Sequence, residues 1–333
     1  MSAPVAVDET FADRVAHAAA ARFGWCTIRD MRVLDGGHSG LTHVAELDTV
    51  DGVVSAVVRA TPPGRRPVGR HDVLRQARIM DALGRHSDVP VPTVLFTDDG
   101  DPPFFGCELV AGVAIDPILG RPQLDETPGQ IAAAWNAVIE LLARLHAAPL
   151  DKLGIADELP REPGDEVEIW GRTMRAARME DNDRAVRLEA ALRASAPPRT
   201  TTGLVHGDFR LGNVMMQSAE PRAVIDWEIW SVGDPAVDVG WLVQFTDAET
   251  YPGIGREVPG TPTADEVVAS YCEAAARDPR SLDWFLALGC FKLAAIQAHN
   301  RRRHLDGHYH DEFQELLGPS IERLLDRGLA IAT

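Results

Sequence analysis

Two stretches of the sequence decide the fold: GLVHGDFRLGN at residues 203–213 and AVIDWE at residues 223–228. The polar side chains of His206, Asp208 and Asn213 lie between apolar runs that we expect to be buried. A buried carboxylate is costly unless it is paired or bound to a metal ion. These polar positions therefore indicate a functional site.

The spacing of the polar residues points to a metal site. The apolar runs on either side of residues 217–222 are predicted to form a hairpin. Asn213 and Asp226 are equidistant from the centre of its loop, so we expect them to face each other at its open end. Amide and carboxylate oxygens suit Mg²⁺. Asp208 would then lie beside the metal and accept a proton from a hydroxyl group.

This arrangement resembles the kinase catalytic loop, in which an aspartate is the base and an asparagine and a later aspartate hold the metals. HGD at residues 206–208, with Asn213, is similar to the aminoglycoside phosphotransferase-like family, as are residues 226–228 and 234–240. The resemblance covers about residues 30–305. It is strongest to the branch containing the phosphotransferase-like domain fused to acyl-CoA dehydrogenase.

The resemblance assigns roles to particular residues. It implies that Asp208 is the catalytic base, and it adds His206 to the catalytic group, although His206 could instead hold the loop in place. Asn213 and Asp226 are the implied metal ligands. Two further acids support the site: Glu228, which would contact substrate or metal or brace its loop, and Asp238, which would brace the catalytic loop from a helix.

The implied fold is α+β and protein-kinase-like, with two lobes. Residues 1–112 would form an N-terminal nucleotide-binding lobe with a small antiparallel sheet, and residues 113–333 a helical C-terminal catalytic and substrate lobe. In the first lobe, the periodicity predicts helices at 8–23 and 70–84 and strands at 25–34, 43–49, 53–60, 93–97 and 104–110. In the second lobe, it predicts helices at 127–146, 165–195, 234–245, 264–277, 281–303 and 311–328.

The nucleotide is expected to lie between the two lobes, under the loop at residues 36–42. By resemblance, its phosphates lie under a glycine-rich loop, and its adenine bonds to backbone groups near Glu108 and Val110. The expected loop contacts are Gly36, Gly37, Ser39 and Gly40. Arg59 stands where kinases have a lysine, and arginine can still hold phosphate oxygens. Gln76 takes the place of the glutamate that would orient this cation, with Asp72 as an alternative partner.

Composition excludes several other functions. A net charge of −17 argues against nucleic-acid binding. The chain has two lysines, Lys152 and Lys292, and neither lies in a Walker A loop. The four cysteines include no CxxC pair, and no apolar run reaches 18 residues. We therefore expect a cytoplasmic protein without a membrane partner, as a monomer or a homodimer.

The function implied is transfer of the γ-phosphoryl group of ATP or GTP, with Mg²⁺, to a hydroxyl group of a small molecule. Aminoglycosides, hydroxyacyl thioesters and other alcohols are all open as acceptors; the acidic C-terminal lobe favours a cation. The alternative is a nucleotide-binding module without catalysis. The replacement of the kinase lysine by Arg59 and of the kinase glutamate by Gln76 would be consistent with it. The presence of Asp208, Asn213 and Asp226 favours the enzyme.

Overall fold

The computed structural model describes residues 9–34, 41–62, 64–120 and 127–332. The chain divides into two compact units. The first unit comprises Met1–Gly112, Asp151–Ile155 and Arg222–Ile229, and the second comprises Val113–Leu150, Ala156–Pro221 and Trp230–Thr333. Within the described ranges, no helix is both long enough and apolar enough to cross a membrane.

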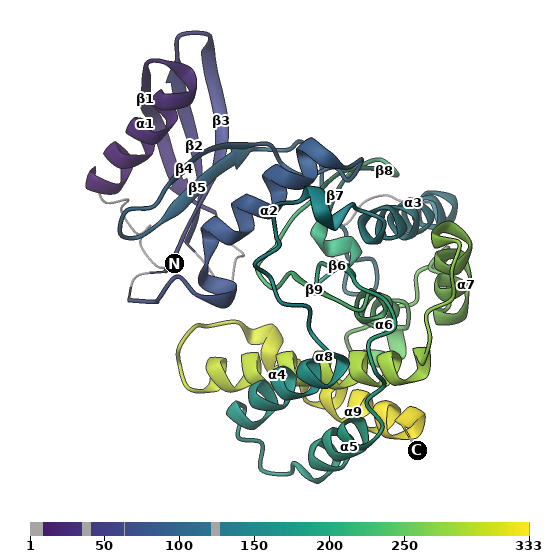
Figure 1. Cartoon of the computed structure of the whole chain (residues 1–333). Helices are drawn as coiled ribbons and strands as arrows, with labels where there is room; N and C mark the ends of the chain where they lie inside the picture. The colour runs from purple at the N-terminus through teal and green to yellow at the C-terminus, as the bar shows by residue number, and fades with distance from the viewer. Residues whose placement is uncertain (1–8, 35–40, 63, 121–126, 333) are drawn as a thin grey trace. The chain divides into compact units, whose positions relative to one another are not determined.

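The first unit is built on a five-stranded antiparallel sheet in the order β1-β2-β3-β5-β4. Its strands are β1 (Cys26–Val33), β2 (Leu41–Thr49), β3 (Gly52–Ala60), β4 (Val94–Asp98) and β5 (Phe104–Glu108). Helix α1 (Glu9–Phe23) packs along β1 and β4 (Figure 1). The expected antiparallel sheet is confirmed.

Strand β3 alternates between the core and the opposite face, as a half-buried strand should. Val58 and Ala60 are buried in the core between α1 and the sheet. Arg59, between them, therefore projects from the other face of the sheet. After β3 the chain forms α2 (Val73–His86), whose first turn is capped by the Asp72 carboxylate, which accepts from Arg75 N at 2.9 Å.

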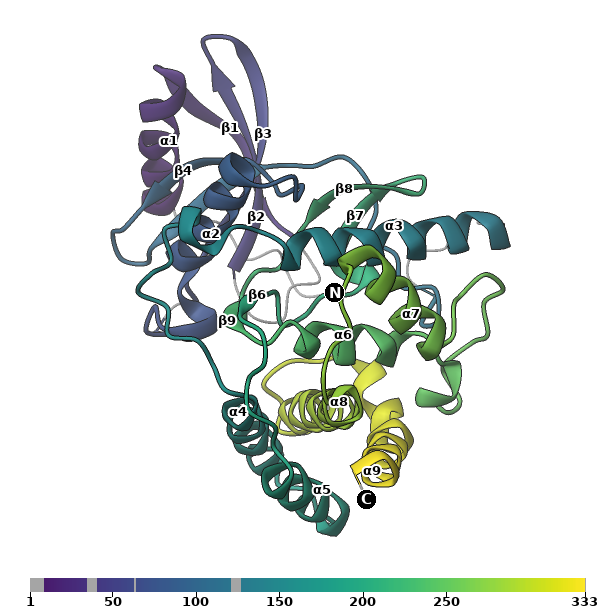
Figure 2. The ribbon, with the colours of Figure 1, turned by 45° about the vertical axis from the view of Figure 1, so that its right-hand side comes forward.

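The second unit is a helical bundle centred on α8 (Leu282–Leu305), which packs against α4, α5, α6 and α9 (Figure 2). The other helices are α3 (Pro128–His146), α4 (Pro163–Ala176), α5 (Asp183–Ala194), α6 (Ala236–Leu242), α7 (Ala264–Ala275) and α9 (Gly318–Ala332). The start of α3 agrees with its sequence signal: Thr127 caps it in a reciprocal box with Gln130, and Pro128 occupies the first turn.

Glycines allow α6 and α8 to cross closely. A Cβ atom at Gly240 would lie 2.2 Å from the Phe285 carbonyl oxygen, and one at Gly289 would lie 2.1 Å from the Gly240 carbonyl oxygen. Any side chain here would collide with backbone, so the two helices approach at a distance that only glycine permits. This crossing fixes the position of the α6 residues that face the loop at residues 206–213.

Several expected elements differ from the structure, including the helix at 311–328, whose first part is the 3-10 helix Glu312–Leu317 before α9. The single helix predicted over 165–195 is two helices, because Arg178 adopts a left-handed conformation after α4. The short strands β6 (Gly203–Val205) and β9 (Ser231–Gly233), which pair with each other, were not predicted. Strands β7 (Val214–Gln217) and β8 (Glu220–Val224) leave a shorter turn than the 217–222 loop. The equidistance of Asn213 and Asp226 from its centre therefore does not hold.

Candidate active site

The Asp208 carboxylate lies in the second unit, in the loop between β6 and β7, and neutral N–H donors hold both of its oxygens. The Trp241 indole donates to Oδ1 at 2.9 Å, and the Asn213 amide donates to Oδ2 at 2.8 Å. The same Asn213 nitrogen donates to the Asp208 carbonyl at 2.8 Å. Arg210 Nε lies 3.6 Å from Asp208 Oδ1, and Arg210 Nη1 donates to Asp116 Oδ2 at 3.1 Å. The carboxylate is thus oriented from several sides.

His206 is fully buried behind this loop. Its Nδ1 accepts a hydrogen bond from Asp208 N at 3.1 Å, and its ring meets Phe209 edge to face. These contacts are of the kind that shape a loop. They favour the reading in which His206 holds Asp208 in place over direct participation in chemistry.

Asp238 anchors the backbone of the loop from α6. Its carboxylate accepts from His206 N at 2.7 Å and from Gly207 N at 2.8 Å, and His146 Nε2 lies 3.2 Å away. Burial opposes ionisation, but the hydrogen bond from His146 and the charge of Lys292 outweigh it, so the pKa of Asp238 is below its usual value.

His146 completes the anchor as a neutral ring. Burial lowers the pKa of His146. Because a carboxylate can only accept, the proton is assigned to Nε2, which donates to Asp238, and Nδ1 then accepts from the Tyr271 hydroxyl at 2.7 Å. Arg277 donates in turn to the Tyr271 oxygen at 3.3 Å. The hydrogen bonds thus converge on Asp238, with donors from Arg277 through His146 on one side and the loop N–H groups on the other.

Arg59, in the first unit, binds two acids at once. Its Nη1 donates to Asp226 Oδ1 and its Nη2 to Glu228 Oε2, each at 2.9 Å. Burial works against the charge, but the two carboxylates outweigh it and hold the pKa of Arg59 above its usual value. Asp226 has a φ of 64°, a left-handed conformation that is strained for a residue with a side chain.

The expected partners of Arg59 on α2 make contacts of their own. The Gln76 amide donates to the Arg70 carbonyl at 3.0 Å, and the Asp72 carboxylate caps the helix. Asp226 and Glu228 are acids that bind Arg59, and the family positions on α2 did not point to them as its partners.

Of the other residues expected to contact the nucleotide, the structure describes Glu108 and Val110. Gly36, Gly37, Ser39 and Gly40 lie outside the described residues. At the end of β5, the Glu108 backbone N–H donates to Thr93 O at 2.9 Å and so is engaged within the sheet. Val110 follows β5 in a segment with no regular secondary structure. Their proposed role toward adenine rests on the resemblance.

Asn213 and Asp226 have the chemistry that Mg²⁺ requires. The hydrogen bonds given above for Asn213 use its nitrogen, and those for Asp226 use Oδ1, which leaves one oxygen of each side chain for a cation. Across the described ranges, no group of three or more His, Cys, Asp and Glu side chains could hold a metal ion. An amide oxygen and a carboxylate oxygen are each of the kind that Mg²⁺ prefers, and these two residues belong to different units.

Sequence reasoning missed two residues that shape the site. Trp241 follows the recognised 234–240 motif directly, and its indole holds Asp208. Lys292 lies buried in the middle of α8, and its amine donates to the Gly207 carbonyl. The sequence feature that could have drawn attention to Lys292 is a single lysine inside the apolar run LGCFKLAA.

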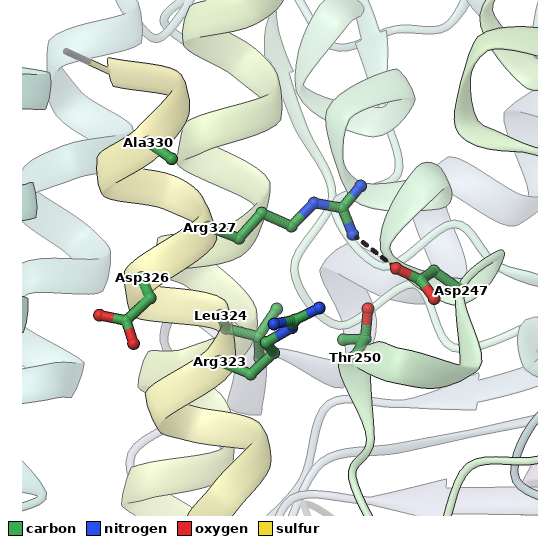
Figure 3. Close-up of a pocket in the computed structure, with 7 residues that line it drawn as sticks. All are labelled: Asp247, Thr250, Arg323, Leu324, Asp326, Arg327 and Ala330. Carbon is green, nitrogen blue, oxygen red and sulfur yellow. Dashed lines mark hydrogen bonds and ion pairs between the residues drawn. The ribbon is translucent and has the colours of Figure 1, made fainter.

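A cavity of about 410 Å³ lies elsewhere in the second unit, between α9 and the turn around Asp247 (Figure 3). Arg327 faces Asp247 across it at 3.4 Å, and Arg323 pairs with Glu249 at 2.6 Å. None of the predicted site residues lines it. Each of the two arginines is thus paired with an acid.

Comparison with known proteins gives a family and a fold. The model of the phosphotransferase enzyme family matches residues 30–285. Acyl-CoA dehydrogenase family member 10 of Mus musculus is 31% identical over 298 residues, which cover 83% of this chain and 27% of the mouse protein. Viomycin phosphotransferase of Streptomyces vinaceus is 28% identical over 235 residues, which cover 63% of this chain and 78% of that protein. The chain thus spans about a quarter of the mouse protein.

Solved structures show the same fold. A macrolide 2'-phosphotransferase type I superposes with a TM-score of 0.64 at 20% identity, covering 97% of this chain and 99% of that chain. A ternary complex of an aminoglycoside phosphotransferase with AMP-PNP and hygromycin B has a TM-score of 0.56 at 18% identity, covering 96% and 97%. The expected protein-kinase-like fold is confirmed.

Proposed function

Because the chain belongs to the phosphotransferase enzyme family, we propose that it transfers the γ-phosphoryl group of ATP to a hydroxyl group of a small molecule. The observation that carries this proposal is the setting of Asp208. Trp241 and Asn213 orient its two carboxylate oxygens through neutral donors, and Asp238 fixes the loop that carries it. A carboxylate oriented in this way is suited to accept the proton of an acceptor hydroxyl.

Each site residue has a role in this proposal. The acceptor oxygen forms a bond to the γ-phosphorus as the bond to the bridging oxygen breaks, and its proton passes to Asp208. Asn213 and Asp226 would hold Mg²⁺, which neutralises charge on the phosphates when bound. They belong to different units, so a shared ion is inferred from their oxygen atoms and their order in the sequence. Arg59 would contact phosphate oxygens, and GTP is the second candidate nucleotide.

Two acceptor classes have support. The name of the Streptomyces vinaceus relative indicates a phosphotransferase for viomycin, and the acidic net charge of this chain favours a cationic acceptor. The mouse relative carries an acyl-CoA dehydrogenase name, which favours a hydroxyacyl thioester. The two classes differ in charge, so one screen separates them.

The test is a screen for phosphate esters by ³¹P NMR, with ATP and Mg²⁺, over aminoglycosides, viomycin, hydroxyacyl thioesters and simple alcohols. We expect a new phosphomonoester signal with one class, and none after chelation of Mg²⁺ by EDTA. If ATP raises the melting temperature of the protein and no acceptor yields an ester, the chain is a nucleotide-binding module without catalysis.

A further inference from the structure

The amine of Lys292 is enclosed by the catalytic loop and two tryptophans. Lys292 lies at the centre of α8 and is 1% exposed. Its Nζ lies 4.4 Å from the centroid of the Trp241 ring and 4.9 Å from that of Trp170, and it donates to the Gly207 carbonyl. Each of these three contacts is one that an ammonium group favours.

A buried amine in this position is costly, which indicates a role. Burial outweighs the nearby charges of Glu166, Asp238 and Asp208 and lowers the pKa of Lys292. The Glu166 carboxylate is engaged by Arg161 at 3.1 Å and by the Trp170 indole at 3.0 Å. Lys292 is thus stabilised by ring faces and a carbonyl, where an apolar side chain of the same length would fill the space without desolvation.

Two of the three contacts lead to Asp208. The Trp241 ring under the amine is the ring whose N–H donates to Asp208 Oδ1 at 2.9 Å. The Gly207 carbonyl belongs to the peptide group that joins Gly207 to Asp208. Lys292 therefore restrains the carboxylate through its indole donor and the backbone through the peptide before it.

We propose that Lys292 is a positioning residue, which acts through Trp241 and Gly207 to hold Asp208 in the orientation that accepts a proton. This inference rests on the proposed phosphotransfer function. A cation over the indole face fixes the plane of the ring and draws electron density from it, which strengthens the N–H as a donor. Lys292 itself does not touch the reacting atoms.

The first test replaces the amine. Lys292→Met keeps the length and the contact with both rings but removes the charge and the donor to Gly207. We expect kcat to fall about 10–100-fold, as displacement of a catalytic group does, with KM for ATP within about twofold because Lys292 does not contact the nucleotide. Lys152→Met, at the exposed other lysine, is the matched control and should leave kcat unchanged.

A second variant tests whether Lys292 acts on Asp208 through Trp241. Trp241→Phe keeps a ring under the amine and removes the N–H that binds Asp208, so it should lower kcat to a similar extent. The double variant should be about as impaired as either single variant, because both act on the same carboxylate. Wild-type kcat in a folded Lys292→Met protein, or losses that multiply in the double variant, would overturn the proposal.

A spectroscopic readout does not depend on activity. The chain has seven tryptophans, and the indole ¹⁵N–¹H signal of Trp241 is the one that disappears in Trp241→Phe. This signal should shift in Lys292→Met and in Asp208→Asn, and stay in place in Lys152→Met. If the wild-type protein transfers no phosphate, the proposed function fails. The indole signal still tests whether Lys292 acts on Trp241. An unmoved signal in Lys292→Met contradicts the proposal.

Discussion

Arg59 keeps the positive charge of the lysine that kinases have at this position, but the acids it pairs with are not the partners expected. In this protein its guanidinium spans Asp226 and Glu228, and a planar fork with two donors suits two carboxylates better than a lysine would. When a nucleotide binds, we propose that this cation is shared with the phosphates. The pairing with Glu228 would keep Arg59 in place if the Asp226 carboxylate held a metal ion.

A double-mutant cycle tests this pairing. Arg59→Ala and Glu228→Gln should show a coupling of about 1 kcal/mol in the free energy of unfolding, because each residue loses the same partly buried contact. The control cycle pairs Arg59→Ala with Gln76→Ala and should show no coupling, since Gln76 bonds to the Arg70 carbonyl. Coupling in the control cycle and none with Glu228 would contradict the geometry.

Asp226→Ala should remove the Mg²⁺ dependence of nucleotide binding. Asp226 is the proposed charged ligand of the ion, and a hard cation loses affinity when an anionic oxygen is removed. Titration calorimetry with ATP, with and without Mg²⁺, measures the effect; the two affinities should converge in the variant. Asp99→Ala, at an exposed acid of the same unit, should behave as wild type. Unchanged Mg²⁺ dependence in Asp226→Ala would remove this residue from the metal site.

At the scale of elements, α6 places two functional side chains with one helix. Asp238 and Trp241 are three residues apart and so lie on one face of the helix. One bonds to the backbone of the catalytic loop and the other to its carboxylate. The crossing of α6 with α8 at Gly240 and Gly289 holds that face in position.

Gly289→Ala should destabilise the protein by about 3 kcal/mol or more, because the new Cβ would lie 2.1 Å from a backbone oxygen and the helices would have to separate. Gly164→Ala is the matched control on α4, where a Cβ meets nothing within 4 Å. It should be neutral or stabilise by up to about 1 kcal/mol. Denaturant unfolding measures both. Equal stabilities would show that α6 and α8 do not cross as described.

The His146–Asp238 anchor predicts loss of stability in acid. The pKa of His146 is lowered in the folded protein, so the unfolded chain binds its proton more readily, and stability falls as the pH drops below about 6.5. The pKa of Asp238 is also lowered, so its contribution is complete above about pH 4 and is lost below. His146→Gln should reduce the fall between pH 6.5 and 5, and His308→Gln, at an exposed site, should not. An identical fall in all three proteins would contradict the anchor.

At the scale of the whole molecule, local signals were sufficient where neighbours in sequence make the structure. The sheet, α2 and the capped start of α3 follow from periodicity, proline and Thr127. The break after α4 was missed because Arg178 adopts a left-handed conformation that its residue type does not announce. The pairing of β6 with β9 was missed because three-residue strands are too short to show alternation.

The site could be predicted from the sequence to about the same extent as the fold. The side chains of Asp208 and Asn213 meet across five residues of chain, which the motif spacing anticipates. The partner of Arg59 lies more than 160 residues away, and family expectation pointed to Gln76 instead. Lys292 reaches the loop from 85 residues away, and its packing could not be read from its own helix. Most of the site features that could not be predicted are contacts between polar groups far apart in the sequence.

The central claim is that Asp208 accepts the proton of the acceptor hydroxyl during phosphoryl transfer. Its most direct test is the single-turnover rate of transfer from ATP by wild type and Asp208→Asn, with nucleotide occupancy measured in the same samples. The account predicts a loss of about 10²–10⁴-fold, the usual contribution of a positioned base, with nucleotide affinity within a few-fold. Transfer by Asp208→Asn at more than half the wild-type rate, with nucleotide bound, would contradict it.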